Sequence, residues 1–168
     1  MADLAGSTVL LAGDQAIVQE AFAALCEANG MRIVGQCTDG PLAVQTILAK
    51  QPDFAIFDLE MPGVTAIELI RSLRSAGCPA KIVILSSSRK DKDAIGAFAA
   101  GANAYLLKDG PARHFLEAIS YVREGGQYVS PLLKGAGLFT KAGANALEDP
   151  LRTESRIAKL LPRWRRRR

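Results

Sequence analysis

Four polar side chains with complementary chemistry stand directly after short apolar runs of the chain. Asp14 follows the run TVLLA and a glycine, Asp58 follows FAIF, Ser86 follows IVIL, and Lys108 follows AYLL. Two carboxylates held close together repel each other, and a hard divalent cation such as Mg²⁺ relieves that repulsion. A lysine and a hydroxyl beside them would bind a phosphoryl group, which a carboxylate can accept as the nucleophile. Taken singly, Asp14 and Ser86 would be interpreted as cap or turn residues.

The apolar runs alternate with segments of helical spacing, and this alternation predicts the elements that would position the four side chains. It predicts an α/β fold: a doubly wound, five-stranded parallel sheet with helices on both faces. In such sheets ligands bind beyond the carboxyl ends of the strands, where the four polar residues stand. The predicted strands are Thr8–Ala12, Arg32–Cys37, Phe54–Phe57, Ile82–Leu85 and Ala104–Leu107, and the predicted helices are Ala16–Ala28, Pro41–Lys50, Ala66–Ser75, Asp93–Ala100 and Arg113–Glu124.

Five segments of the chain are similar to one protein family: TVLLAGDQAIVQEAF, QPDFAIFDLEMPGVTAIELIRSLR, KIVILSSS, GANAYLLKDG and GGQYVSP. They resemble the receiver domains of response regulators, of the NarL/FixJ-like type joined to helix-turn-helix output domains of the LuxR class. The resemblance covers residues 8–131 without a gap. It implies a flavodoxin-like (βα)5 receiver fold and a cytoplasmic two-component phosphoprotein in transcription regulation. It also implies that the chain is no enzyme beyond catalysing its own phosphorylation and dephosphorylation.

The resemblance assigns roles to individual residues. It implies that Asp58 accepts a phosphoryl group from a sensor histidine kinase. Mg²⁺ would be held by Asp14, by Asp58 and by the backbone carbonyl of Glu60. Ser86 and Lys108 would contact the phosphoryl oxygens.

The family also implies a switch and a dimer. Tyr105 would be the aromatic switch whose rotation follows the loop after the fourth strand, and a homodimer would form through the fourth helix, fifth strand and fifth helix. The chain departs from the family at Gly13, where the first of two adjacent acids usually stands. We expect weaker Mg²⁺ binding, by about 1–3 kcal/mol, with phosphorylation preserved. The alternatives are that Gly13 only relaxes the turn, or that the receiver signals independently of phosphorylation.

The net charge of +4 is unevenly distributed. Residues 151–168 carry seven Arg and one Lys against Glu154, whereas residues 1–150 carry 13 basic and 16 acidic side chains. We therefore divide the chain into a receiver domain (1–130), a flexible Gly-rich linker (131–148), and a short helix with an Arg-rich tail (149–168) that resembles the start of an output domain. No second helix follows that could enter the major groove, so we expect no sequence-specific DNA binding. The tail could instead bind nucleic acid non-specifically, be a solvated end, or dock on an acidic surface.

Several other functions are disfavoured by the sequence. No apolar stretch reaches the roughly 20 residues of a membrane span, and no export signal is present, so we expect a soluble protein that does not enter a membrane. The three cysteines are never spaced C-x-x-C, which argues against a disulfide framework or a zinc site. A phosphohydrolase with Glu60 as proton donor is a rival that the continuous receiver pattern opposes. We interpret His114, the sole histidine, as a solvated residue of a first helical turn.

Overall fold

A parallel sheet lies at the centre of the molecule. The computed structural model describes residues 3–133 and 135, and the strands of its main sheet follow the order β2-β1-β3-β6-β7-β8. Every neighbouring pair in this sheet is parallel. The chain runs from β1 to one edge, returns beside β1 as β3 and continues to the other edge, so the strand order reverses between β1 and β3. The strands are β1 (Thr8–Ala12), β2 (Arg32–Cys37), β3 (Phe54–Asp58), β6 (Lys81–Ser86), β7 (Ala104–Leu107) and β8 (Tyr128–Val129).

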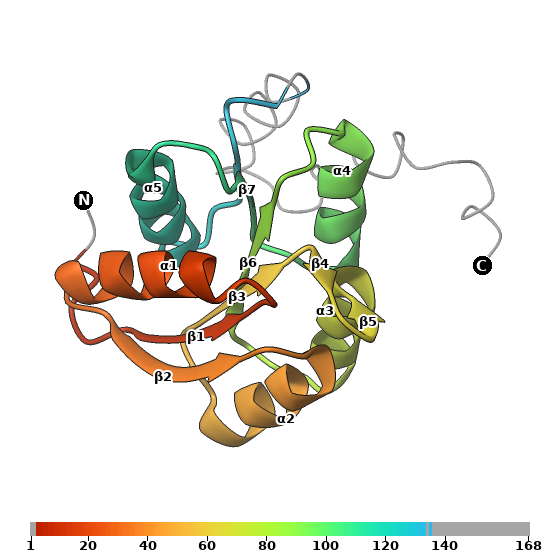
Figure 1. Ribbon diagram of the computed structural model, residues 1–168, viewed down its shortest axis with the longest axis horizontal. Helices are drawn as coiled ribbons and strands as arrows, with labels where there is room; N and C mark the ends of the chain where they lie inside the picture. The colour runs from red at the N-terminus through yellow and green to blue at the C-terminus, as the bar shows by residue number, and fades with distance from the viewer. Residues whose placement is uncertain (1–2, 134, 136–168) are drawn as a thin grey trace, which may run out of the picture.

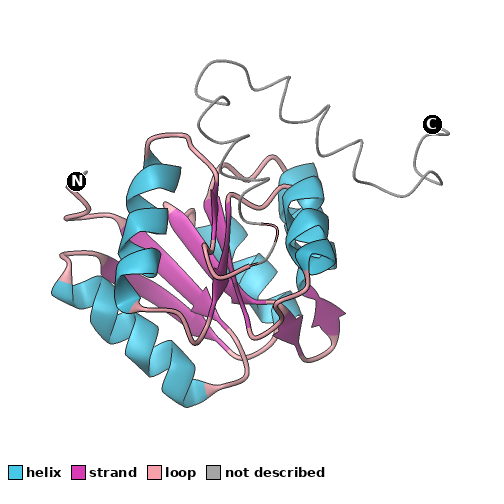
Figure 2. Cartoon of the chain, turned by 90° about the horizontal axis from the view of Figure 1, so that it is seen from above, coloured by secondary structure: helices cyan, strands magenta, loops and turns pink. Residues whose placement is uncertain are grey.

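Helices cover both faces of the sheet, as Figures 1 and 2 show. Helices α1 and α5 pack on one face, and α2, α3 and α4 pack on the other. The inner strands are mainly apolar because alternate residues face opposite cores: Leu11 of β1 joins the cluster under α1 and α5, and Leu10 joins the cluster under α2, α3 and α4. The helices are α1 (Ala16–Ala28), α2 (Gly40–Lys50), α3 (Ala66–Ser75), α4 (Asp91–Ala100) and α5 (Ala112–Arg123).

The predicted doubly wound α/β fold is confirmed, with two additions. β8 pairs with β7 as a sixth strand, and its two residues are too few to show a hydrophobic period. The second addition is the antiparallel pair β4 (Glu60–Met61) and β5 (Val64–Thr65), which turns at Gly63 with a φ of 79°. This hairpin carries the chain away from the end of β3 and into α3.

A reciprocal hydrogen-bond pair fixes the start of α3 after that hairpin. The Thr65 hydroxyl accepts a hydrogen bond from the Glu68 backbone N–H at 3.2 Å, and the Glu68 carboxylate accepts one from the Thr65 N–H at 2.9 Å. The bonds that the Thr65 N–H and the Thr65 hydroxyl donate to the Glu68 carboxylate lower its pKa, since they favour its ionised form. The loop that follows the candidate phosphoacceptor is therefore anchored at its far end.

The packed part of the chain continues past residue 130. Leu133 is buried in the core cluster under α4, and the Gly135 N–H donates a hydrogen bond of 3.1 Å to Asp91 at the start of α4. Most of the predicted linker and the whole Arg-rich tail lie outside the described residues, so their boundaries stay predictions. None of the helices in the described part of the chain is long and apolar enough to cross a membrane.

Candidate functional site

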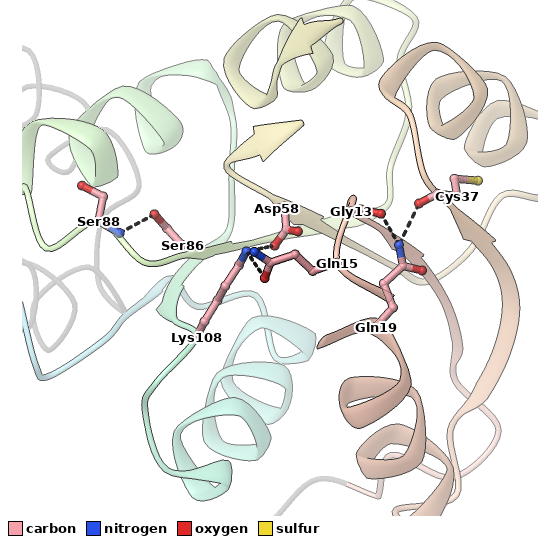
Figure 3. A network of polar contacts seen from close by, with 8 residues as sticks. All are labelled: Gly13, Gln15, Gln19, Cys37, Asp58, Ser86, Ser88 and Lys108. Atoms are coloured by element: carbon pink, nitrogen blue, oxygen red, sulfur yellow. Dashed lines mark hydrogen bonds and ion pairs between the residues drawn. The ribbon is translucent and has the colours of Figure 1, made fainter. Parts of the chain in front are cut away.

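Three of the predicted site residues lie at the carboxyl-terminal edge of the sheet (Figure 3): Lys108 contacts Asp58, and the Ser86 hydroxyl is directed toward Ser88. Asp58 is the last residue of β3, Ser86 is the last residue of β6, and Lys108 follows β7 directly. β3, β6 and β7 are consecutive parallel neighbours, so their carboxyl ends lie side by side. Asp14 follows β1, the other neighbour of β3, and its side chain is exposed. The structure therefore brings the predicted residues to the point where the strand order reverses.

Asp58 is a buried carboxylate with a lysine beside it. Its side chain is 3% exposed, and the Lys108 Nζ lies 2.8 Å from its Oδ1. Burial raises the pKa of the Asp58 carboxyl, because desolvation penalises the charged form, and this outweighs the opposing effect of Lys108. The nearby carboxylates of Asp14 and Glu60 raise the pKa further. The site thus concentrates negative charge around one partly desolvated acid.

Gly13 leaves the space into which the Asp58 carboxylate extends. A Cβ atom at position 13 would overlap Oδ2 of Asp58 and lie 2.9 Å from its Cγ. The backbone here is held by the buried side chain of Gln19, which donates hydrogen bonds to the carbonyls of Gly13 and, at 2.9 Å, of Cys37 (Figure 3). A larger residue at position 13 therefore requires the Asp58 carboxylate to rotate. The departure from the family pattern at Gly13 changes the shape of the site as well as its charge.

The β1–α1 loop supplies a further residue that sequence reasoning missed. The Oε1 of Gln15 lies 3.5 Å from the Lys108 Nζ, which places the ammonium group between Asp58 and Gln15. An uncharged glutamine directly after Asp14 gave no chemical signal in the sequence.

Ser88 is a hydrogen-bond centre at the start of the β6–α4 loop. Its N–H donates to the Ser86 Oγ at 2.9 Å, its carbonyl accepts from the Tyr105 hydroxyl at 3.0 Å, and its own hydroxyl donates to Asp93 in the first turn of α4. Tyr105 is fully buried, and burial raises the pKa of its phenol. The sequence gives no sign of this role, because Ser88 is one of three consecutive serines without a distinguishing pattern.

The donor groups available to a cation are limited. Asp14 and Asp58 offer carboxylates, and Glu60 is the exposed first residue of β4, two positions after Asp58. Nowhere in residues 3–133 and 135 do three or more His, Cys, Asp or Glu side chains gather as a metal site. Two carboxylates with a backbone carbonyl suit Mg²⁺, which keeps several waters, and do not suit a tetrahedral zinc site.

His114 corrects a sequence-based expectation. Its side chain is 9% exposed rather than solvated, because the first turn of α5 faces α1 and the loop after β7. It lies on the α1 and α5 face of the sheet and lines the same pocket as Lys108.

Comparison with known proteins agrees with this geometry. Residues 9–120 match the family model of the response regulator receiver domain. The chain is 35% identical over 127 residues to the transcriptional regulatory protein DesR of Bacillus subtilis, which covers 75% of this chain and 63% of DesR. It is 28% identical over 160 residues to the nitrate/nitrite response regulator protein NarL of Escherichia coli K12, covering 95% of this chain and 72% of NarL.

Solved structures give the same result. The signal receiver domain of the putative response regulator NarL from Mycobacterium tuberculosis superposes with a TM-score of 0.67 at 26% identity, covering 72% of this chain and 98% of that one. A LuxR-family two-component response regulator from Aurantimonas sp. SI85-9A1 superposes with a TM-score of 0.75 at 27% identity. The superposition covers 82% of this chain and 99% of that one. With a family model that spans most of the chain and a site built on the matching strands, the chain belongs to the response regulator receiver family.

Proposed function

We propose that this receiver accepts a phosphoryl group on Asp58 from a sensor histidine kinase and passes the signal on through protein contacts. The observation that carries the proposal is the buried Asp58 carboxylate with the Lys108 ammonium 2.8 Å away, at the edge of the sheet where the Ser86 strand also ends. The named relatives are response regulators, and the matched region of DesR is 63% of that protein, so the activity of a whole regulator is part of the proposal.

The reaction uses groups that the chain itself supplies. A carboxylate oxygen of Asp58 attacks the phosphorus of a phosphohistidine, the P–N bond breaks, and the imidazole leaves with the electron pair and takes up a proton. An acyl phosphate forms on Asp58. The Lys108 ammonium and the Ser86 hydroxyl stabilise the charge on the transferred oxygens, and the buried position of Asp58 excludes bulk water from the new bond.

The residues around Asp58 fit a Mg²⁺ ion. The carboxylates of Asp14 and Asp58 and the backbone carbonyl of Glu60 would hold it. Burial and, to a smaller extent, the charges of Asp14 and Glu60 raise the pKa of Asp58, and a cation would favour its ionised form. When bound, the ion would neutralise charge on the phosphoryl oxygens. With Gly13 in place of an acid, we expect weaker binding than in receivers with two acids.

Ser88 and Tyr105 would transmit the phosphorylation of Asp58 to α4. Phosphoryl contact by the Ser86 hydroxyl would disturb the Ser88 N–H bond, and Ser88 in turn contacts both Tyr105 and Asp93 of α4. A homodimer through α4, β7 and α5 stays part of the proposal, with β8 added because it pairs along the outer edge of β7.

A second candidate is a receiver that signals independently of phosphorylation. It is favoured by Gly13, which removes an acid and lets the Asp58 carboxylate extend toward the end of β1. Under this alternative the Lys108–Asp58 pair would be a permanent structural contact rather than part of a phosphoryl site.

Intact-mass spectrometry distinguishes the two candidates. The full chain is incubated with acetyl phosphate, with and without Mg²⁺, beside an Asp58→Asn variant. Phosphorylation predicts a mass gain of one phosphoryl group that requires both Mg²⁺ and Asp58. Absence of any gain at saturating Mg²⁺ would contradict the proposal and support the phosphorylation-independent receiver.

A further inference from the structure

The chain turns immediately after β8. Ser130 is 1% exposed, and its N–H donates a hydrogen bond of 2.8 Å to the carbonyl of Tyr105 in β7. The Leu133 N–H donates to the Ser130 carbonyl at 3.1 Å, and the Leu133 side chain is buried in the cluster under α2, α3 and α4. Leu132, in the same turn, is 42% exposed. Residues 130–135, which we call the strap, are therefore held at one end by β7 and by a single buried leucine.

The far end of the strap is fastened to the first residue of α4. The Gly135 N–H donates a hydrogen bond of 3.1 Å to the Asp91 carboxylate. Gly135 is itself buried, and a Cβ atom there would lie 2.8 Å from the Asp91 Cγ, so a larger residue would displace the carboxylate. The strap thus runs from β7 to the end of the molecule at which α4 begins (Figure 1, blue).

The same turn of α4 is joined to the phosphoryl site. Asp93, two residues after Asp91, accepts a hydrogen bond from the Ser88 hydroxyl, and the Ser88 N–H donates to the hydroxyl that would contact the phosphoryl group. Tyr105 makes a second connection, because its hydroxyl donates to the Ser88 carbonyl and its own carbonyl accepts from Ser130. Movement of the β6–α4 loop therefore acts on both ends of the strap.

We propose that the strap is fastened to α4 while Asp58 is unphosphorylated and is released when Asp58 is phosphorylated. The inference rests on the proposed function, because release begins when the Ser86 hydroxyl binds the phosphoryl group. The Ser88 N–H then loses its partner, and the β6–α4 loop and the first turn of α4 shift together. The strap reaches α4 through one hydrogen bond to Asp91, which such a shift breaks.

The strap also lies on the face that the proposed homodimer would use. It spans from β7 to α4, so a homodimer through α4, β7 and α5 forms after the strap has left this face. Release and phosphorylation are thermodynamically linked. Loosening the strap therefore favours the phosphorylated conformation as much as phosphorylation loosens the strap.

Trypsin measures the release, because it cuts after Lys134, inside the strap. The full chain is digested with Mg²⁺, in the presence and absence of acetyl phosphate, and intact mass gives the phosphorylated fraction of each sample. We expect the phosphorylated chain to yield the fragment 1–134 about tenfold faster, since cutting follows the population of the open form. A mass gain without faster cutting would overturn the strap and leave the phosphoacceptor assignment standing. Absence of a mass gain would contradict the proposed function and the release together.

Two neighbouring leucines of the strap form a matched pair of variants. Leu133 is buried, whereas Leu132 is exposed. Without phosphorylation, Leu133→Ala should be cut about tenfold faster than the wild type, and Leu132→Ala should keep the wild-type rate. Peptides of residues 128–141 with each substitution correct for the sequence preference of trypsin. Equal cutting of the two variants would show that Leu133 does not hold the strap and would overturn the proposal.

Two variants of Asp91 test the fastening to α4 without removing a core residue. Asp91→Ala removes the acceptor of the Gly135 N–H, whereas Asp91→Asn keeps an acceptor oxygen. We expect cutting about fivefold faster in Asp91→Ala and close to the wild-type rate in Asp91→Asn, with unchanged circular dichroism in both. If Asp91→Ala is cut at the wild-type rate, the strap is not fastened to α4, and the connection to the phosphoryl site fails.

Discussion

The side chains on the two sides of Asp58 differ in how many hydrogen bonds and ion pairs hold them in place. On the β1 side, formed by Gly13, Asp14 and Gln15, one carboxylate is exposed and a glycine leaves space. On the β6–β7 side, formed by Ser86, Ser88, Tyr105 and Lys108, the groups are held by hydrogen bonds and by the ion pair to Asp58. The half that we propose to bind the phosphoryl group therefore keeps a defined geometry, whereas the half that would bind the cation has one acid fewer. This difference predicts a receiver that retains phosphoryl chemistry but binds Mg²⁺ more weakly.

The largest effect should come from Lys108, on the β6–β7 side. Lys108→Ala removes the positive charge 2.8 Å from Asp58, and we expect phosphorylation by acetyl phosphate to slow by about 100-fold or more. The rate is measured by intact mass over time. Lys81→Ala is the control, since Lys81 lies at the opposite end of β6. Equal rates in the two variants would contradict the role of the β6–β7 side.

Two substitutions at position 13 separate shape from charge on the β1 side. Gly13→Ala and Gly13→Asp both force the Asp58 carboxylate to rotate, but only Gly13→Asp adds an acid. We expect the Asp variant to bind Mg²⁺ about tenfold more tightly than the Ala variant, as measured by calorimetric titration. If the two variants bind Mg²⁺ equally, the missing acid does not limit the site, and the contrast between the two sides is steric alone.

Asp58 itself should be a source of instability in the absence of Mg²⁺. Because the pKa of the Asp58 carboxyl is raised in the folded state, this carboxyl ionises at a lower pH in the unfolded chain than in the folded chain. Its ionisation therefore lowers the free energy of unfolding at pH values above the ordinary carboxyl pKa. Asp58→Asn should therefore raise the free energy of unfolding at neutral pH, by an amount on the order of 1 kcal/mol. The gain should shrink as the pH falls below the carboxyl range, which urea unfolding at several pH values would check. A gain that is constant with pH would argue against ionisation as its cause.

The smallest effect is expected in the β6–α4 loop. Ser88→Ala removes the hydroxyl bond to Asp93 and should lower the free energy of unfolding by about 0.5–1.5 kcal/mol. Ser87→Ala is the matched control, because Ser87 is exposed. Thermal unfolding of both variants measures the difference, and a loss of the same size in Ser87→Ala would remove the distinction between the two serines.

The sequence predicted the β6–β7 side better than the β1 side. Asp58, Ser86 and Lys108 follow apolar strands, and the parallel topology alone brings such positions together. Ser88 and Gln15 could not be found in this way, because their roles depend on the path of loops rather than on residue type. The space at Gly13 is likewise a property of side-chain packing: the missing acid was visible in the sequence, but the position of the Asp58 carboxylate was not.

His114 and β8 show the same limit for the fold. The burial of His114 depends on how the start of α5 packs beside the loop after β7, which local sequence does not encode. β8 has two residues and forms only because β7 offers an open edge.

The central claim is that Asp58 is the phosphoacceptor, and borohydride trapping tests it most directly. Borohydride reduces an aspartyl phosphate to homoserine, so the chain is treated with acetyl phosphate and Mg²⁺, reduced, digested and sequenced by tandem mass spectrometry. We predict homoserine at position 58, and none there when Mg²⁺ is omitted. Homoserine at another aspartate, or at no position, would contradict the account.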